Sequence, residues 1–185
     1  AGTVLDGGGT AIQVGGTNTA PASCSDGNRF LVTWISGGNA VKAARVLGGG
    51  GFESVSDVKV AATDILVDQV RCSFATADKF LVAWGENELG VTRLHARNLR
   101  NTDANLGAVK NPVTANRGAW GLASVGADNA LVWANASNGV ITARILDKNG
   151  TAQSETATLA TAVGTVDSVS LAVGGSVLLA AWSDV

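Results

Sequence analysis

Four short runs of apolar residues, each ending in tryptophan, recur along the chain. They read Phe-Leu-Val-Thr-Trp at 30–34, Phe-Leu-Val-Ala-Trp at 80–84, Ala-Leu-Val-Trp at 130–133 and Val-Leu-Leu-Ala-Ala-Trp at 177–182. The tryptophans at 34, 84, 133 and 182 are 50, 49 and 49 residues apart, and such a fixed period indicates a repeated structural unit. Since polar residues do not alternate with the apolar ones, each run predicts a strand covered on both faces.

A second phrase follows each of the first three runs. It reads Ala-Ala-Arg-Val-Leu at 43–47, His-Ala-Arg-Asn-Leu at 95–99 and Thr-Ala-Arg-Ile-Leu at 142–146. Gly and Asn between the two phrases, at 37–39, 87–90 and 137–139, suit short turns. Each pair of phrases therefore predicts an antiparallel hairpin.

A complete unit can be written as four strands. In the second unit we expect an inner strand near 69–76, a second strand at 79–84, a third at 91–99 and an outer strand at 105–114. The outer segments mix Thr, Ser and Gln with Val and Ala, as half-solvated edge strands do.

The third strand of the fourth unit is expected from the N-terminal residues of the chain. Residues 1–10 resemble residues 142–151, with Leu-Asp, a glycine turn and Thr at the same spacing. This swapped half-unit predicts a closed ring, because closure would complete the unit and remove exposed strand edges. The fold expected is all-β, a four-bladed β-propeller.

The expected blades span residues 19–66, 67–115 and 116–163, with the fourth formed from 164–185 together with 1–18. Two alternatives stay open: an eight-bladed ring made by two chains, and a part of a larger polypeptide or assembly. A sandwich or solenoid does not explain the swapped half-unit.

Composition narrows the class of protein. The chain has 185 residues, 24 Gly, 2 Pro and a net charge of −2, with 13 basic residues scattered along it. Scattered basic residues predict no nucleic-acid partner, and the absence of an 18-residue apolar run predicts no membrane-spanning helix. Low charge with Ala, Gly, Thr, Ser and Asn on the surface suggests an exported protein.

The two cysteines, Cys24 and Cys72, fall ten and twelve residues before their tryptophans. Inner strands of neighbouring blades converge, so a disulfide between them is geometrically feasible. Two buried thiols are the alternative. With the single His95 on another strand, no metal-ligand spacing is recognisable, and we expect neither a metal nor a cofactor.

The carboxylates divide into two groups. Asp26, Asp78 and Asp128 precede second strands, where Asp side chains cap turns. Six others do not follow the repeat: Glu86 and Glu88 in the turn after Trp84, Asp64 and Asp68 in the connection between the first two units, and Asp167 and Asp184. The turns after second strands and the connections between blades are expected on one face of the ring, the loop face. A carboxylate pair there would permit glycoside hydrolysis if one member had a raised pKa, which makes a hydrolase a remote alternative.

Trp120 has no counterpart among the repeated tryptophans. It lies beside Arg117 and is expected where Cys24 and Cys72 lie in their own units. Trp120 and Arg117 are thus candidate ligand-contacting residues, although a core role for the tryptophan is the competing interpretation.

The repeated strand resembles the Phe-Leu-Val-x-Trp β-propeller repeats of large secreted or surface proteins of bacteria, and by architecture alone the propeller lectins. The residues that carry this resemblance are structural, so no functional residue follows from it. We expect a non-enzymatic, extracellular binding or scaffold module with a protein or glycan ligand on the loop face, and a carbohydrate-binding lectin as the alternative.

Overall fold

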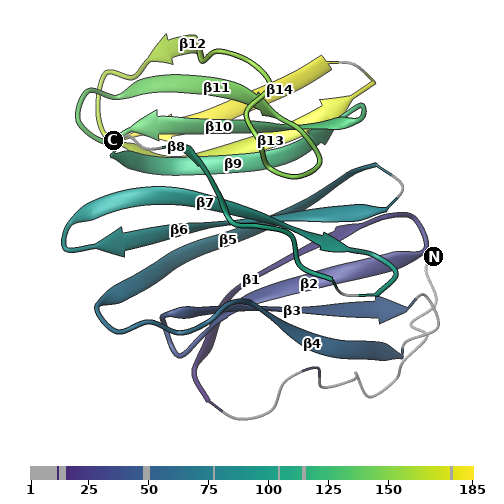
Figure 1. Ribbon diagram of the computed structural model, residues 1–185. Helices are drawn as coiled ribbons and strands as arrows, with labels where there is room; N and C mark the ends of the chain where they lie inside the picture. Colours follow the sequence, from purple (N-terminus) through teal and green to yellow (C-terminus); the bar gives the residue numbers. More distant parts are fainter. Residues whose placement is uncertain are drawn as a thin grey trace, which may run out of the picture.

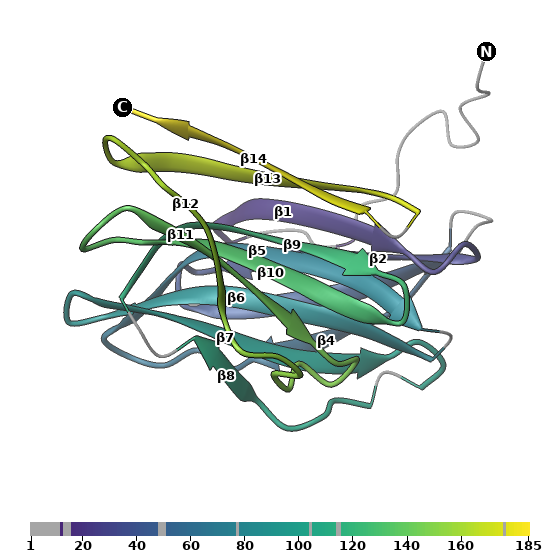
Figure 2. The same cartoon turned by 90° about the horizontal axis from the view of Figure 1, so that it is seen from above.

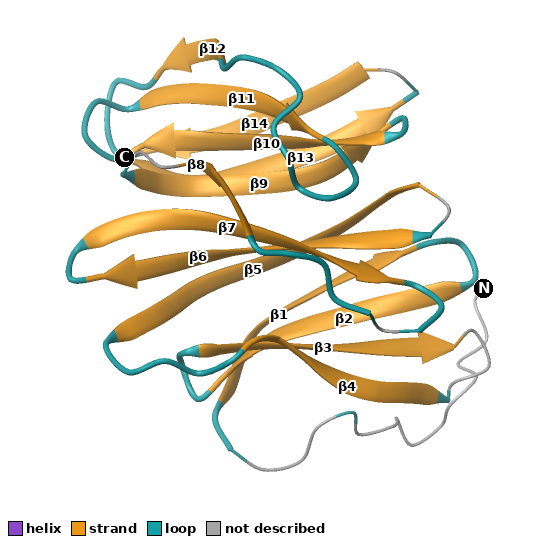
Figure 3. Cartoon of the chain, in the orientation of Figure 1, coloured by secondary structure: helices purple, strands orange, loops and turns teal. Residues whose placement is uncertain are grey.

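The computed structural model describes residues 12, 16–47, 51–76, 78–103, 105–113, 116–175 and 177–185. Within these residues the chain forms strands joined by turns and loops, and no helix (Figure 1, Figure 3). The all-β prediction is therefore confirmed.

The strands form four antiparallel sheets in chain order. Sheet 1 holds β1 (Asn18–Ser25), β2 (Arg29–Ser36), β3 (Ala40–Leu47) and β4 (Phe52–Lys59). Sheet 2 holds β5 (Ile65–Thr76), β6 (Lys79–Glu88), β7 (Val91–Arg100) and β8 (Lys110–Val113). Sheet 3 holds β9 (Arg117–Val125), β10 (Asp128–Asn135), β11 (Val140–Leu146) and β12 (Ala157–Thr161), and sheet 4 holds β13 (Val166–Gly174) and β14 (Val177–Asp184).

The second unit shows how closely the expected strands match. The inner, second and third strands are present, but β6 continues four residues beyond Trp84 to Glu88. The outer strand is much shorter than expected, because β8 covers only Lys110–Val113. Leu89 and Gly90 form the turn, both with positive φ, of 51° and 85°.

The sheets stack face to face, with the inner strand β5 packed between β1 and β9, and β9 packed against β13 (Figure 1, Figure 2). On β6, Phe80, Val82 and Trp84 join the apolar cluster with sheet 1. The intervening Leu81 and Ala83 join the cluster with sheet 3. Side chains that alternate across a strand thus reach two different interfaces, which explains why this strand is apolar at nearly every position.

The fourth repeat of the apolar run behaves differently. On β14, Leu178 and Ala180 pack toward sheet 3, while Val177 and Leu179 are 67% and 65% exposed. Figure 2 shows β14 at the margin of the molecule. Among the described residues nothing packs against the outer face of β14, so cover on both faces is seen for β6 and β10 but not for β14.

The repeated arginine of the third strands joins neighbouring sheets. Arg97 of β7 donates from Nη1 to the carbonyl of Val58 in β4, 3.0 Å away. Arg144 of β11 donates from Nη1 to the carbonyl of Pro112 in β8, 2.8 Å away. In both units the guanidinium satisfies a backbone acceptor on the outer strand of the preceding sheet.

Arg45 occupies the same place in the repeat but is oriented differently. In sheet 1, Lys42 lies opposite Trp34, and Arg45 comes three residues after Lys42. In sheet 2, His95 lies opposite Trp84, and Arg97 comes only two residues after His95. A change of one residue turns a side chain to the other face of a sheet. Arg45 accordingly pairs with Glu53 at 2.7 Å and donates to the carbonyl of Asn101, in the turn directly after β7, at 2.8 Å.

A disulfide joins Cys24 of β1 to Cys72 of β5, with Cα atoms 5.7 Å apart. It links the inner strands of sheets 1 and 2, so the chain offers a bridge and not two free thiols.

The described strands do not form a closed ring of four equal blades, because sheet 4 holds only two of them. The strand expected from residues 1–10 to complete it lies outside the described residues.

Replacing both cysteines by serine should lower the free energy of unfolding by about 2–4 kcal/mol, because the bridge closes a long loop of the unfolded chain. The sequence separation of 48 residues sets that loop. Urea denaturation at neutral pH measures the loss, and wild-type protein treated with a thiol reductant should show the same shift. An unchanged midpoint would contradict a stabilising bridge.

Candidate functional site

A cavity of about 590 Å³ opens among the inner strands, with residues of β1, β5, β9 and β13 in its wall. The residues that border it are Ala20, Asp68, Gln69, Arg71, Thr92, Arg117, Gly118, Ala119, Trp120, Asp167, Ser168, Val169 and Ser170. Three of the six candidate binding residues thus meet at one place: Asp68, Arg117 and Trp120.

Asp68 and Arg117 form a salt bridge across the boundary of sheets 2 and 3. Nη2 of Arg117 donates to both carboxylate oxygens of Asp68, at 2.6 and 2.7 Å. Arg117 is only 5% exposed, and its guanidinium lies directly over Gly85, where a Cβ atom would overlap it. Residue 85 is glycine because the guanidinium of Arg117 occupies the space that a side chain at this position would need.

Arg71 lines both this cavity and a smaller adjoining hollow of about 270 Å³. Among the described residues it has no carboxylate partner; its Nη1 donates to the carbonyl of Val70 at 3.3 Å. Burial lowers the pKa of Arg71, although a guanidinium stays charged at neutral pH.

Trp120 is a core residue. Its side chain is fully buried in the cluster between sheets 2 and 3. Trp120 lies opposite Trp133, as Val70 lies opposite Trp84. The expectation that Trp120 occupies the place of the cysteines is wrong, because Cys72 lies two residues beyond Val70 and corresponds to Leu122.

Glu86 lies in a buried polar cluster between sheets 1 and 2. Its carboxylate accepts a hydrogen bond from Nε1 of Trp84 at 2.7 Å and lies 3.2 Å from Nε2 of His95 and 3.7 Å from Nζ of Lys59. The His95 ring stacks on Trp84 with centroids 5.6 Å apart. Burial acts to raise the pKa of Glu86, but hydrogen bonds from His95 and Trp84, with the charges of His95 and Lys59, bring it below the ordinary value.

Glu88 and Asp64 are peripheral. Both Glu86 and Glu88 belong to β6 and not to the turn after Trp84; this corrects their expected location. Glu88 is exposed and lies 4.0 Å from Arg93. Asp64 is exposed in a turn with φ of 67°.

Asp26 caps the turn before β2, as expected from its position in the sequence. Its Oδ1 accepts the backbone N–H groups of Asn28 at 2.8 Å and Arg29 at 2.6 Å. Burial tends to raise the pKa of Asp26, but these backbone hydrogen bonds and one from Asn101 bring it below the ordinary value. The side chain thus fixes the turn before β2.

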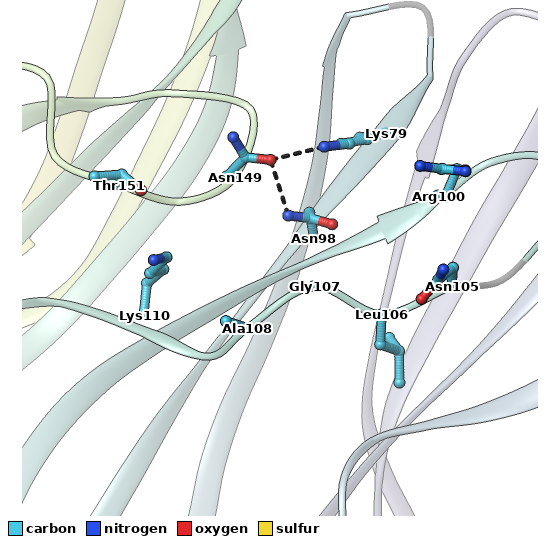
Figure 4. Close-up of a pocket in the computed structure, with 10 residues that line it drawn as sticks. All are labelled: Lys79, Asn98, Arg100, Asn105, Leu106, Gly107, Ala108, Lys110, Asn149 and Thr151. Atoms are coloured by element: carbon cyan, nitrogen blue, oxygen red, sulfur yellow. Dashed lines mark hydrogen bonds between the residues drawn. The ribbon is translucent and has the colours of Figure 1, made fainter.

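A second polar hollow lies at the opposite end of sheet 2, where β6 begins and β7 ends. This inter-sheet pocket has a volume of about 390 Å³ (Figure 4). It is bordered by Lys79, Asn98, Arg100, Asn105, Leu106, Gly107, Ala108, Lys110, Asn149 and Thr151.

Asn149 organises this pocket. Its Oδ1 accepts Nζ of Lys79 at 2.8 Å and Nδ2 of Asn98 at 3.1 Å, and Figure 4 shows both side chains directed at it. The turn of sheet 3 that carries Asn149 is held by Asp147, whose Oδ1 accepts the N–H groups of Asn149 and Thr151 at 2.8 and 2.7 Å.

The sequence pattern does not predict this pocket. Its residues come from four separate segments, and none belongs to the two repeated phrases except Asn98. One sequence feature points to the pocket. The basic residues Lys79, Arg100 and Lys110 all belong to the second unit, and the Asp-Lys-Asn-Gly turn at 147–150 belongs to the third.

Comparison of the sequence with models of known protein families and with curated proteins gives no match. Within the described ranges, no three His, Cys, Asp or Glu side chains are grouped as metal ligands. In the same part of the chain no helix meets the length and apolarity needed to cross a bilayer.

Glu86→Gln should destabilise the protein in a pH-dependent way. Because the pKa of Glu86 is lowered on folding, its contribution is present at neutral pH and is lost as the pH falls below the ordinary 4.5 through the folded-state value. We expect a loss of about 2 kcal/mol at neutral pH, and a smaller difference from wild type in acid. Urea denaturation across this pH range tests it, with the exposed Glu88→Gln as control. A difference that stays constant with pH would contradict the charged cluster.

Proposed function

We propose that this chain is a non-enzymatic binding module of an exported protein, built as a four-bladed β-propeller, and that its ligand occupies the inter-sheet pocket. The observation that supports this proposal most directly is the composition of the pocket. Cationic, amide and hydroxyl groups from sheets 2 and 3 converge there around the amide of Asn149.

The volume and lining favour a small polar ligand. Ligand pockets commonly measure roughly 300–1,000 Å³, and a hollow of about 390 Å³ falls within that range. Flat protein interfaces bury larger, less concave surfaces. This supports the lectin hypothesis over a purely protein-binding scaffold.

The disulfide supports export. Such bonds persist in oxidising compartments and are rare in the cytosol, and Cys24–Cys72 joins the inner strands of two sheets.

The carboxylates support a role without catalysis. A glycosidase acid needs a raised pKa, whereas the pKa of Glu86 is lowered. Asp68 is held through both oxygens by Arg117. These acids act as partners for cations at the sheet boundaries.

Unmatched apolar surfaces support closure of the ring. Phe30 of sheet 1 is 49% exposed, and Val177 and Leu179 of sheet 4 are 67% and 65% exposed. Phe30 lies on the face of β2 opposite to Leu31 and Ile35, which pack against sheet 2. Closure of the ring would bring these two surfaces together and remove them from water.

A designed disulfide tests closure. In sheet 3, Ile145 lies opposite Ala130; if residues 1–10 pair with β14 in the same way, Val4 lies opposite Leu179. The double variant Val4→Cys, Leu179→Cys should cross-link within one chain on mild oxidation, seen as faster migration without reductant.

The matched control is Val4→Cys with Leu178→Cys, whose side chains would point to opposite faces of the sheet. Equal cross-linking in both pairs would contradict the proposed register. A cross-linked dimer would instead indicate the two-chain, eight-bladed ring.

Binding is tested on an array of neutral, carboxylated and sulfated saccharides. Wild-type protein should bind a subset saturably, and Asn149→Ala should lose that binding because it releases Lys79 and Asn98. Asn87→Ala, which removes a turn cap at the opposite end of sheet 2, should retain it. Binding that survives Asn149→Ala, or an array without binding, would overturn the proposal.

A further inference from the structure

We propose that the inter-sheet pocket binds the acid group of an acidic saccharide, a carboxylate or a sulfate ester. This inference rests on the proposed function and specifies the ligand class of the same pocket.

The charge of the lining is the first reason. Lys79, Arg100 and Lys110 border the pocket, and no Asp or Glu is among the described residues that line it. The whole chain carries a net charge of −2, so three cations around one hollow are a local excess. Cations gathered in a concave site attract and hold anions.

The second reason is that none of these three cations has a strong ion pair among the described residues. Lys79 donates to the neutral amide of Asn149. Lys110 has no ion pair within the described ranges. Arg100 lies 3.2 Å from Asp103, but both side chains are about half exposed, at 47% and 49%, and such a pair contributes little.

Besides Asp103, two carboxylates lie close in sequence to the lining, and both are otherwise engaged. Asp147 accepts the backbone of its own turn. Asp78 lies 3.7 Å from Lys148. Neither borders the pocket, so an incoming anion would meet cations and amides.

Neutral groups beside the cations indicate a sugar rather than a bare ion. The amide of Asn98 lies against Gly107, where a Cβ would overlap it. The side chains of Asn105 and Thr151 form no hydrogen bond with other described residues, and both border the pocket. Amides and hydroxyls can both donate to and accept from sugar hydroxyls, whereas inorganic sulfate has no proton to donate and would leave their acceptor oxygens unused.

Titration calorimetry with three matched disaccharides tests the inference: one with a sulfate ester, one with a carboxylate, and their neutral parent. Inorganic sulfate at the same ionic strength is the fourth ligand. Wild-type protein should bind the sulfated or the carboxylated sugar, or both, at least tenfold more tightly than the neutral parent and inorganic sulfate. Added salt should weaken the binding.

Lys110→Gln should weaken binding of the acidic sugar roughly tenfold, as loss of one charge-assisted contact predicts. Lys148→Gln is the matched control, because Lys148 belongs to the same turn as Asn149 but pairs with Asp78 outside the pocket. Near-ultraviolet circular dichroism confirms the fold of each variant, and Arg100→Gln provides a second test of the charge.

The outcomes separate the two proposals. Tight binding of the neutral parent that Asn149→Ala abolishes would overturn the acidic ligand but leave the binding function standing. Equal affinity for inorganic sulfate would overturn the saccharide. Equal losses in Lys110→Gln and Lys148→Gln would overturn the location, and no binding of any ligand would overturn both proposals.

Discussion

The middle strands β6 and β10 have both of their faces covered by neighbouring sheets. On β6, Trp84 packs toward sheet 1 while Leu81 packs toward sheet 3, and on β10, Leu131 and Val132 divide in the same way between sheets 2 and 4. A single sheet of this composition would expose two apolar faces to water. Stacking is therefore the condition under which each unit is stable, and unmatched surfaces appear where the described stack ends.

The polar residues of the sheet boundaries follow from this stacking. Arg97 and Arg144 reach backbone carbonyls of the preceding sheet, and Arg117 and Glu86 find partners on neighbouring elements. Buried charges require such partners. Asp68 and Glu86 are engaged at such boundaries. The inter-sheet pocket is bordered by Lys79, Arg100 and Lys110, with no Asp or Glu among the described residues of its lining.

Much of the fold could be predicted from the apolar pattern, whereas most of the pocket could not. The repeated tryptophan marked the second strands, and the length of β6 was underestimated because Glu86 looks like a turn residue until Lys59 and His95 are seen around it. Asp68 and Arg117 were both singled out as candidates, but their pairing depends on contact between β5 and β9. Lys79 and Asn149 are 70 residues apart in sequence and meet through the packing of two sheets.

The sequence by itself determined the all-β class and the antiparallel order of strands in sheets 1 to 3, because hydrophobic periodicity and turn residues act over a few neighbouring positions. Tertiary structure decided which side chains meet. A one-residue difference in hairpin register turned Arg45 toward sheet 2, and stacking brought Asn149 to Lys79 and Asn98. These contacts depend on distances between sheets, which no local pattern encodes.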